Sequence, residues 1–111
     1  MSRDWQLYLQ DVLQSCEKIG RYTAGMTQQS FLSDDRTSDA VVRNLEIIGI
    51  AVKRLPDEIR AQMPTIDWSS IAGMRDIVAH EYFRIDSDIL WDVVQNKVRE
   101  LESAVRTFLN E

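Results

Sequence analysis

Apolar residues recur along the chain at spacings of three and four, which is the period of an amphipathic α-helix. The first such pattern covers residues 3–23, and Gly25 favours a stop soon after it. Its apolar stripe consists of Trp5, Leu9, Val12, Leu13, Cys16 and Ile19. A short helical turn is predicted over residues 27–32, with Thr27 as its cap and Phe31 pointing inward.

A second long helix is predicted over residues 38–55, with Thr37 or Ser38 as its cap and Pro56 at its end. One of its faces is formed by Val41, Leu45, Ile48, Val52 and Leu55, and it is widened by Val42, Ile47, Ile50 and Ala51. Such a helix is expected to be central, or to be buried on both sides by the core and a partner chain. Gly49 inside it favours a close contact between helices.

The remaining pattern predicts a short amphipathic turn over residues 56–63, a break at Pro64 and two further helices. Asp67 is expected to cap a third long helix that contains Trp68, Ile71, Met74, Ile77 and Val78. The last helix is expected after an Asp86-Ser87 cap, with an apolar stripe of Leu90, Val94, Leu101, Val105 and Phe108. No continuous period-two alternation predicts a strand. The predicted fold is an all-α, antiparallel four-helix bundle with one or two short extra helices, formed as one domain over residues 1–111.

Composition narrows the class of protein. The chain has 111 residues, of which 44% are hydrophobic and 28% are charged, as in an ordinary globular protein. Apolar runs such as residues 47–52 are too short to span a membrane, and the N-terminal residues lack the apolar core of a signal peptide. The single cysteine, Cys16, has no partner for an internal disulfide and lies on an apolar stripe. We therefore expect a packing role for Cys16 and a cytoplasmic location for the protein.

The net charge of −5 and the pI near 4.8 are unfavourable for a protein that binds nucleic acid. A local cluster of arginines can nevertheless act against the overall sign of the charge. The acidity also hints at a basic partner.

Candidate chemistry is concentrated in residues 74–85, which read MRDIVAHEYFRI and hold the only histidine, His80. At about 100° per residue, Arg75 and Tyr82 project from nearly the same helix face, whereas His80 lies roughly 140° from Arg75. Arg75 and His80 can therefore meet one substrate only if the helix ends or frays near His80, or if two protomers each contribute one of them.

Arginine and histidine suit cleavage of an RNA phosphodiester. Histidine titrates near neutrality, so it can take a proton from a ribose 2′-hydroxyl or give one to the leaving 5′-oxygen. Arginine can hold the phosphate in a bidentate contact while charge builds on it. No metal is needed if the 2′-hydroxyl is the nucleophile. Because the chain has one histidine and the reaction uses both a base and an acid, a symmetric dimer would supply the second imidazole.

A structural role for the same residues stays open from the sequence alone. A lone histidine near a helix end is often a capping or hydrogen-bonded residue. Arg75 could pair with a nearby carboxylate, and Tyr82 could pack at the edge of the core with its hydroxyl in water.

At this segment the sequence resembles a known family. RDIVAHEY, residues 75–82, matches the R-x4-H-x-Y motif of the HepT-like branch of the HEPN superfamily. Residues 39–56 resemble the second long helix of that family, residues 66–76 its approach to the motif, and residues 91–101 its final helix. The resemblance covers nearly the whole chain and implies an all-α bundle of HEPN type.

The resemblance also implies an activity and partners. It implies a homodimer whose cleft gathers Arg75 and His80 from both subunits and acts as a metal-independent endoribonuclease without a cofactor. It further implies the toxin of a type VII toxin–antitoxin pair, with an MntA-like nucleotidyltransferase as the antitoxin. That partner would transfer AMP from ATP to Tyr82, which would place a phosphate and an adenosine beside the cleft. Further candidate supporting residues are Asp76, Glu81 and Arg84.

One position departs from the family pattern. Where family members often carry Gly-Glu-Ala in the second helix, this chain has Gly49-Ile50-Ala51. The missing acidic residue and the acidic composition favour an alternative, a non-catalytic helper subunit that binds a nucleotidyltransferase. A plain helical dimerisation module is the third hypothesis, and the apolar second helix would suit all three.

Overall fold

The computed structural model describes residues 4–73 and 87–110. Within these residues all regular structure is helical, so the prediction of an all-α fold is confirmed. The elements are α1 (Asp4–Thr23), α2 (Gln28–Leu32), α3 (Asp35–Lys53), α4 (Asp57–Arg60), α5 (Trp68–Ala72), α7 (Ser87–Asp92), the π-helical turn η1 (Val93–Lys97) and α8 (Val98–Leu109).

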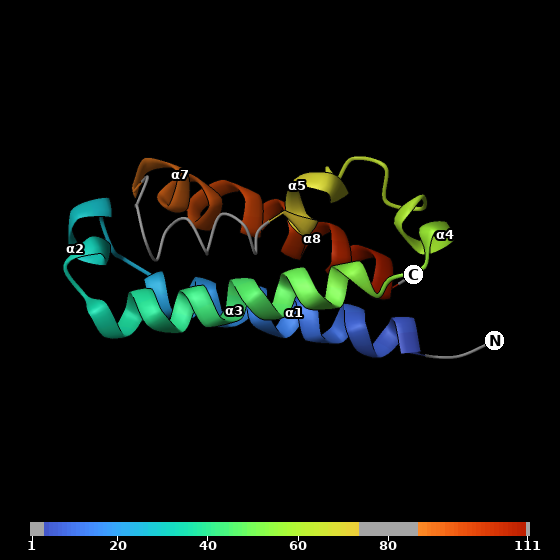
Figure 1. Ribbon diagram of the computed structural model, residues 1–111, viewed down its shortest axis with the longest axis horizontal. Coiled ribbons are helices and arrows are strands. Elements are labelled where there is room, and N and C mark those ends of the chain that lie inside the picture. Colours follow the sequence, from blue (N-terminus) through green and yellow to red (C-terminus); the bar gives the residue numbers. More distant parts are fainter. Residues whose placement is uncertain (1–3, 74–86, 111) are drawn as a thin grey trace.

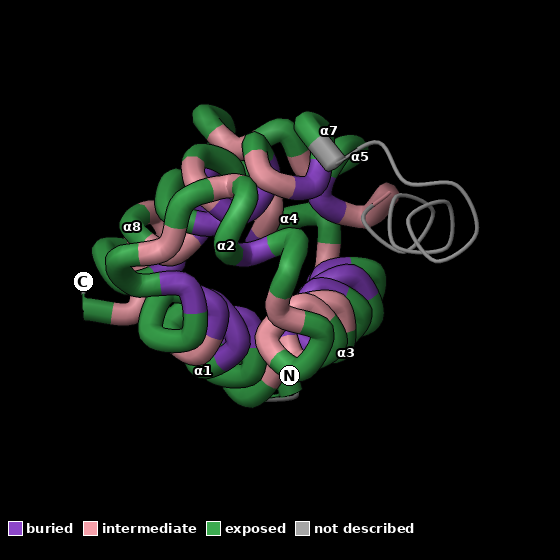
Figure 2. The backbone as a smooth tube through the Cα atoms, turned by 90° about the vertical axis from the view of Figure 1, so that its left-hand side faces the viewer, coloured by how far each residue is buried: buried purple, intermediate pink, exposed green. Residues whose placement is uncertain are grey.

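The long helices form a bundle in two layers. Helices α1 and α3 run antiparallel, side by side, in one layer, and α5, α7 and α8 lie across them in the other (Figures 1 and 2). Helix α1 contacts both α3 and α8, while α3 also contacts α2 and α5. The short connections that Gly25 and Pro56 predicted make sequential helices neighbours, as expected for an antiparallel bundle.

The core lies between the two layers and contains the predicted stripes. Purple, buried positions of the backbone in Figure 2 face the inside of the bundle. Fully buried side chains come from every long element, and they include Leu9, Val12, Ile19, Phe31, Val41, Leu45, Ile48, Val52, Leu101 and Val105. At the ends of α1 and α8, the rings of Trp5 and Phe108 meet edge to face with centroids 5.9 Å apart.

Local signals predicted the first connection correctly. Helix α1 ends at Thr23, and Gly25 adopts a φ of 76°, a left-handed conformation that glycine takes at little cost. Thr27 then caps α2 by accepting a hydrogen bond from the backbone N–H of Ser30, and Phe31 is fully buried. The predicted cap and the predicted inward residue are both confirmed.

The predicted start and cap of the second long helix were wrong. Helix α3 begins at Asp35, three residues earlier than expected, and its cap is Asp34. The Asp34 carboxylate accepts hydrogen bonds from the backbone N–H of Thr37 at 3.1 Å and from the Thr37 hydroxyl at 2.8 Å. These bonds lower the pKa of Asp34, the backbone bond having the larger effect. Ser38 instead donates to the carbonyl of Phe31 and joins α3 to α2.

Helix α3 buries only one of its faces, whereas its apolar positions predicted burial nearly all round. The predicted face of Val41, Leu45, Ile48, Val52 and Leu55 is buried, as is Gly49. The opposite face is exposed and mostly charged, and it carries Asp35, Arg36, Asp39, Arg43, Glu46, Ile50, Lys53 and Arg54. Among the described residues, therefore, α3 is covered on one side and open on the other.

Two other predicted helices differ in detail. Asp67 caps α5 as expected, but α5 ends at Ala72 with Gly73 as its C-cap, so the third helix does not run on unbroken from Trp68. Residues 74–86, which hold the rest of that prediction and Asp86 of the predicted cap, lie outside the described residues. In the last helix the N–H of Val98 donates to the carbonyl of Val93, five residues back. The wider π turn brings Val93, Val94 and Val98 into the core together.

Candidate functional site

All six residues that the sequence nominated for the site, Arg75, Asp76, His80, Glu81, Tyr82 and Arg84, lie outside the described residues. The structure therefore describes the two elements that bound this segment, α5 before it and α7 after it.

Helix α5, which leads into the motif segment, is fixed by its first residues. The Asp67 carboxylate accepts bonds from the backbone N–H of Ser70 at 3.2 Å and from the Ser70 hydroxyl at 2.7 Å. These bonds lower the pKa of Asp67, the hydroxyl bond having the larger effect. The indole N–H of Trp68 is shared between the carbonyls of Arg60, at 3.0 Å, and Met63, at 3.2 Å. The connection from α4 is thereby tied to α5, which packs on α3.

Helix α7, which follows the motif segment, is anchored on α2. The amide of Gln28 donates to the Asp88 carboxylate at 2.6 Å. The ring of Phe31, fully buried, lies 5.3 Å from the ring of Trp91, centroid to centroid. The two helices on either side of the motif segment, α5 and α7, therefore contact the α2–α3 part of the bundle.

Ile50, where the resemblance led us to expect an acidic residue, lies on the outer surface of α3 with 40% of its area exposed. Its neighbour Gly49 is buried. An acidic side chain at position 50 would therefore face outward from α3 and would not enter the core of its own chain. Its absence leaves the packing of the bundle intact.

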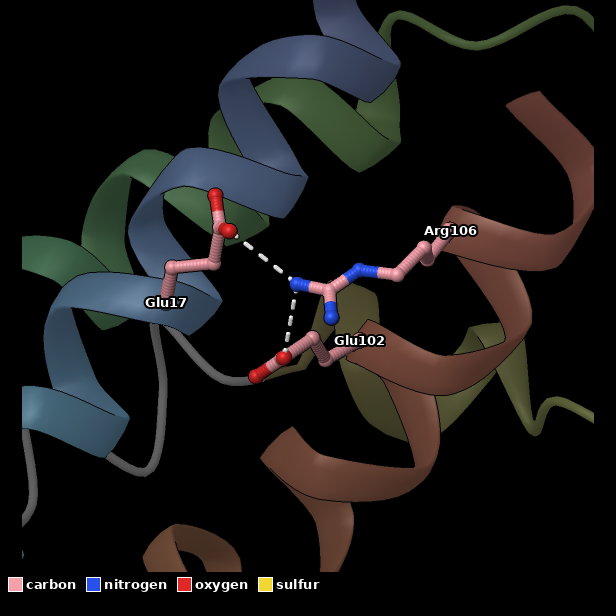
Figure 3. A network of polar contacts seen from close by, with 3 residues as sticks. All are labelled: Glu17, Glu102 and Arg106. Atoms are coloured by element: carbon pink, nitrogen blue, oxygen red, sulfur yellow. Dashed lines mark hydrogen bonds and ion pairs between the residues drawn. The ribbon is translucent and has the colours of Figure 1, made fainter. Parts of the chain in front are cut away.

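Sequence reasoning missed a polar network that joins α1 to α8. The guanidinium of Arg106 donates to Glu17 at 3.0 Å and to Glu102 at 2.9 Å, as Figure 3 shows. The Arg106–Glu102 pair has the i,i+4 spacing of a helix pair, but the link to Glu17 spans 89 residues. All three side chains are partly exposed, so the network braces the two helices at the surface and contributes modestly to stability.

Open grooves on the described surface include one beside the α4–α5 connection and one between α1 and α8. One, of about 770 Å³, lies between the α4–α5 connection and α8 and is lined in part by Met63, Ile66 and Phe108. The other, of about 650 Å³, lies between α1 and α8 around Arg106. Among residues 4–73 and 87–110 no group of three or more His, Cys, Asp or Glu side chains is placed to hold a metal ion. In those ranges no helix is long and apolar enough to cross a membrane.

Cys16 is a packing residue, as its place on the apolar stripe predicted. Its side chain is fully buried in the core, and that burial raises the pKa of the thiol well above its ordinary value. The thiolate, which is the reactive form, is therefore suppressed at neutral pH.

Comparison with known proteins shows to which protein family the chain belongs. The all-helical bundle is of HEPN type, and residues 12–108 match the family model described as "Ribonuclease HepT-like". The chain belongs to this HepT-like family. It is 38% identical over 113 residues to "Putative RNase MJ0127" of Methanocaldococcus jannaschii, covering 98% of this chain and 93% of the relative. No solved structure gives a significant match.

Two further relatives span other organisms. "Putative RNase TTE0752" of Caldanaerobacter subterraneus is 40% identical over 104 residues, covering 94% of this chain and 93% of the relative. "Probable ribonuclease HepT" of Thermococcus cleftensis is 37% identical over 102 residues, covering 92% of this chain and 93% of the relative. The similarity thus extends over nearly the whole of both chains in each case.

Proposed function

We propose that this chain is a metal-independent endoribonuclease toxin that acts as a homodimer, with Arg75 and His80 of both subunits in one cleft. A nucleotidyltransferase antitoxin of the MntA type neutralises it by transferring AMP to Tyr82. The observation that carries the proposal is the family match over residues 12–108, which contains the whole R-x4-H-x-Y motif at residues 75–82.

The chemistry of the motif supports a reaction at the 2′-hydroxyl of RNA. One imidazole removes the proton of the 2′-hydroxyl, whose oxygen attacks the adjacent phosphorus. The second imidazole, from the other subunit, protonates the leaving 5′-oxygen. Arg75 binds the phosphate oxygens as negative charge builds on them. The products are a 2′,3′-cyclic phosphate and a free 5′-hydroxyl, so atoms and protons balance without a metal or an added co-reactant.

The direct test is incubation of the purified chain with single-stranded RNA in the presence of EDTA. Cleavage that leaves 2′,3′-cyclic phosphate ends is expected, and RNA whose 2′-hydroxyls are methylated should stay intact because the nucleophile is blocked. Expression of the chain alone should arrest growth. If the purified chain leaves RNA intact and its expression is harmless, the proposal fails and the helper-subunit alternative gains.

Two observations favour that alternative. The family's acidic residue is absent at Ile50, and the net charge of the chain is −5. A helper subunit would bind a nucleotidyltransferase without cleaving RNA. Co-purification with the partner therefore does not distinguish the two functions, whereas the cleavage assay does.

We expect the protein to be a dimer in solution. A composite cleft needs two chains, so light scattering at micromolar concentration should give about twice the chain mass of 12.9 kDa. The measurement should be repeated across a tenfold dilution to detect dissociation. A monomer at every concentration that still cleaves RNA would exclude the shared cleft.

We expect Tyr82 to be the site of AMP transfer. After incubation with the nucleotidyltransferase and ATP, the intact mass should rise by whole AMP units, and Tyr82→Phe should abolish the rise because it removes the accepting oxygen. Tyr8→Phe is the matched control, since Tyr8 lies on α1 outside the motif. RNA cleavage should fall as modification proceeds. An unchanged rise in Tyr82→Phe would assign the modification to another residue.

A further inference from the structure

Three arginines lie on one line along the exposed face of α3. Arg43 follows Arg36 by seven residues and Arg54 follows Arg43 by eleven, and all three are exposed. At about 100° per residue, these spacings return to the same side of a helix within about 20°. Ile50 lies near this line, so no carboxylate stands between Arg43 and Arg54 at that position. The line runs for about 27 Å, at about 1.5 Å per residue.

The charges of these arginines are not used in ion pairs within residues 4–73 and 87–110. The described ion pairs engage two other arginines, Arg60 and Arg106. Asp39 and Glu46 follow Arg36 and Arg43 by three residues on α3, but the described contacts include no ion pair between them. The guanidinium of Arg54 lies over the ring of Tyr8, with 5.8 Å between Cζ and the ring centroid. Within the described residues, therefore, none of the three arginines is neutralised by a carboxylate in contact with it.

Two tyrosines of α1 border the same line. Tyr8 meets Arg54 across the antiparallel α1–α3 pair, which Figure 1 shows side by side. Fourteen residues later, Tyr22 lies on the same side of α1 within about 40°, and it is 40% exposed. Because α1 and α3 are antiparallel, the position of α3 opposite Tyr22 is expected about fourteen residues before Arg54. That is position 40, which lies between Arg36 and Arg43. The arginine–tyrosine face thus comprises Tyr8, Tyr22, Arg36, Arg43 and Arg54.

We propose that the arginine–tyrosine face binds the RNA substrate, with the arginines on successive phosphates and Tyr22 stacked on a base. This inference rests on the proposed ribonuclease function and names where the substrate runs outside the cleavage site. A cationic track with interleaved aromatic rings is the arrangement that binds single-stranded nucleic acid without sequence preference. The length of the line suits several nucleotides, since a stacked strand advances about 3.4 Å per nucleotide.

Charge complementarity favours RNA over a second copy of this chain. A two-fold contact brings the same patch of each subunit together, so two arginine lines would face each other. RNA brings one negative charge per nucleotide. On a chain with a net charge of −5, the RNA is attracted to places where cations gather, and the three arginines of this face form no described ion pair with the carboxylates beside them.

The test uses RNA with 2′-O-methyl groups, which the wild-type protein can bind without cleaving. Fluorescence anisotropy compares Arg36→Gln/Arg43→Gln with a charge-matched control, Lys97→Gln/Arg99→Gln, whose residues are exposed on η1 and α8. We expect the face variant to raise Kd about tenfold and to reduce the slope of log Kd against log salt by about 1.4, for two lost phosphate contacts. The control should change Kd less than threefold.

Substitutions at Tyr22 give a second, independent test of the binding face. Tyr22→Ala should weaken binding about tenfold through loss of stacking, while Tyr22→Phe should bind like wild type because it keeps the ring. Equal weakening by both charge variants, or wild-type binding by the face variant, would overturn the proposal. Conversion of the dimer to a monomer by the face variant would also overturn it, because the face would then be a contact between subunits.

Failure of this inference is separable from failure of the proposed function. If unmodified RNA is cleaved and the face variant keeps the KM of wild type, the proposed ribonuclease function stands. The proposal that the arginine–tyrosine face binds RNA then fails. If wild type binds the methylated RNA through the face but leaves unmodified RNA intact, the binding face stands and the catalytic proposal fails.

Discussion

Replacing His80 with alanine is expected to lower kcat for RNA cleavage by about 10²- to 10⁴-fold, the usual contribution of a general acid or base. His80 is the only histidine of the chain, so the substitution removes both imidazoles from a symmetric dimer. Arg75→Ala should cost about 10²- to 10³-fold, because it removes a donor to the phosphate as charge develops. Both should be measured as single-turnover cleavage of single-stranded RNA in EDTA.

A control for this prediction comes from outside the motif. Arg99→Ala removes an equal charge from an exposed residue of α8, and it should reduce kcat by less than about tenfold. All variants should keep the helical circular dichroism and the dimer mass of wild type. The variants should also bind 2′-O-methyl RNA within a few-fold of wild type, since the lost interaction acts in the transition state. Cleavage by His80→Ala at the wild-type rate would remove histidine from the mechanism.

The pH dependence follows from the same assignment. One imidazole must be neutral to accept a proton and the other must be charged to donate one, so kcat should follow a bell-shaped curve when plotted against pH. A rate that rises steadily with pH would indicate that hydroxide, and not an imidazole, removes the proton.

Most of the fold could be predicted because its signals are local. The α1 stripe, the stop at Gly25 and the Thr27 cap each depend on residues a few positions apart. The start of α3 was harder to predict because Asp34, Thr37 and Ser38 are all good caps. Asp34 is the cap because it accepts two hydrogen bonds from Thr37, while the Ser38 hydroxyl donates instead to the carbonyl of Phe31.

Features that depend on distant residues could not be predicted from the sequence. The π turn at η1 keeps Val93, Val94 and Val98 in the core at once, which a regular period of 3.6 does not require. The pairing of Arg106 with Glu17 depends on the packing of α8 against α1. The open face of α3 was not predicted because apolar residues such as Ile47 and Ile50 occur on or beside it. Their neighbours on the helix surface are charged.

A candidate site could be nominated from the sequence because the motif is contiguous, from Arg75 to Tyr82, and its residues stay a prediction because they lie outside the described residues. The convergence of Arg75 and His80 could not be predicted, because a spacing of five residues would put them on different sides of a regular helix. It would depend on how two subunits pair, which local spacing does not encode. The arginine line on α3 was not singled out because its members are spread over nineteen residues, and only burial reveals that they share an open face.

Phe31→Ala is expected to have the largest effect on stability, lowering the free energy of unfolding by about 3–5 kcal/mol. Phe31 is fully buried, and its ring contacts Trp91, so the substitution opens a cavity where α2 holds α7. The adjacent Leu32 is the matched control, because it is 37% exposed and its replacement by alanine should cost less than about 1 kcal/mol. Urea unfolding followed by circular dichroism measures both.

The same substitution links stability to the site. Helix α7 begins directly after the motif segment, so a loosened contact between α2 and α7 should raise the mobility of one end of that segment. At a temperature where the variant is still folded, Phe31→Ala should therefore lower kcat and change KM less. Leu32→Ala should change neither constant. Equal stability of the two variants would show that the α2–α7 contact does not hold the bundle together at this end. A destabilised Phe31→Ala with wild-type kcat would show that the contact between α2 and α7 does not govern catalysis.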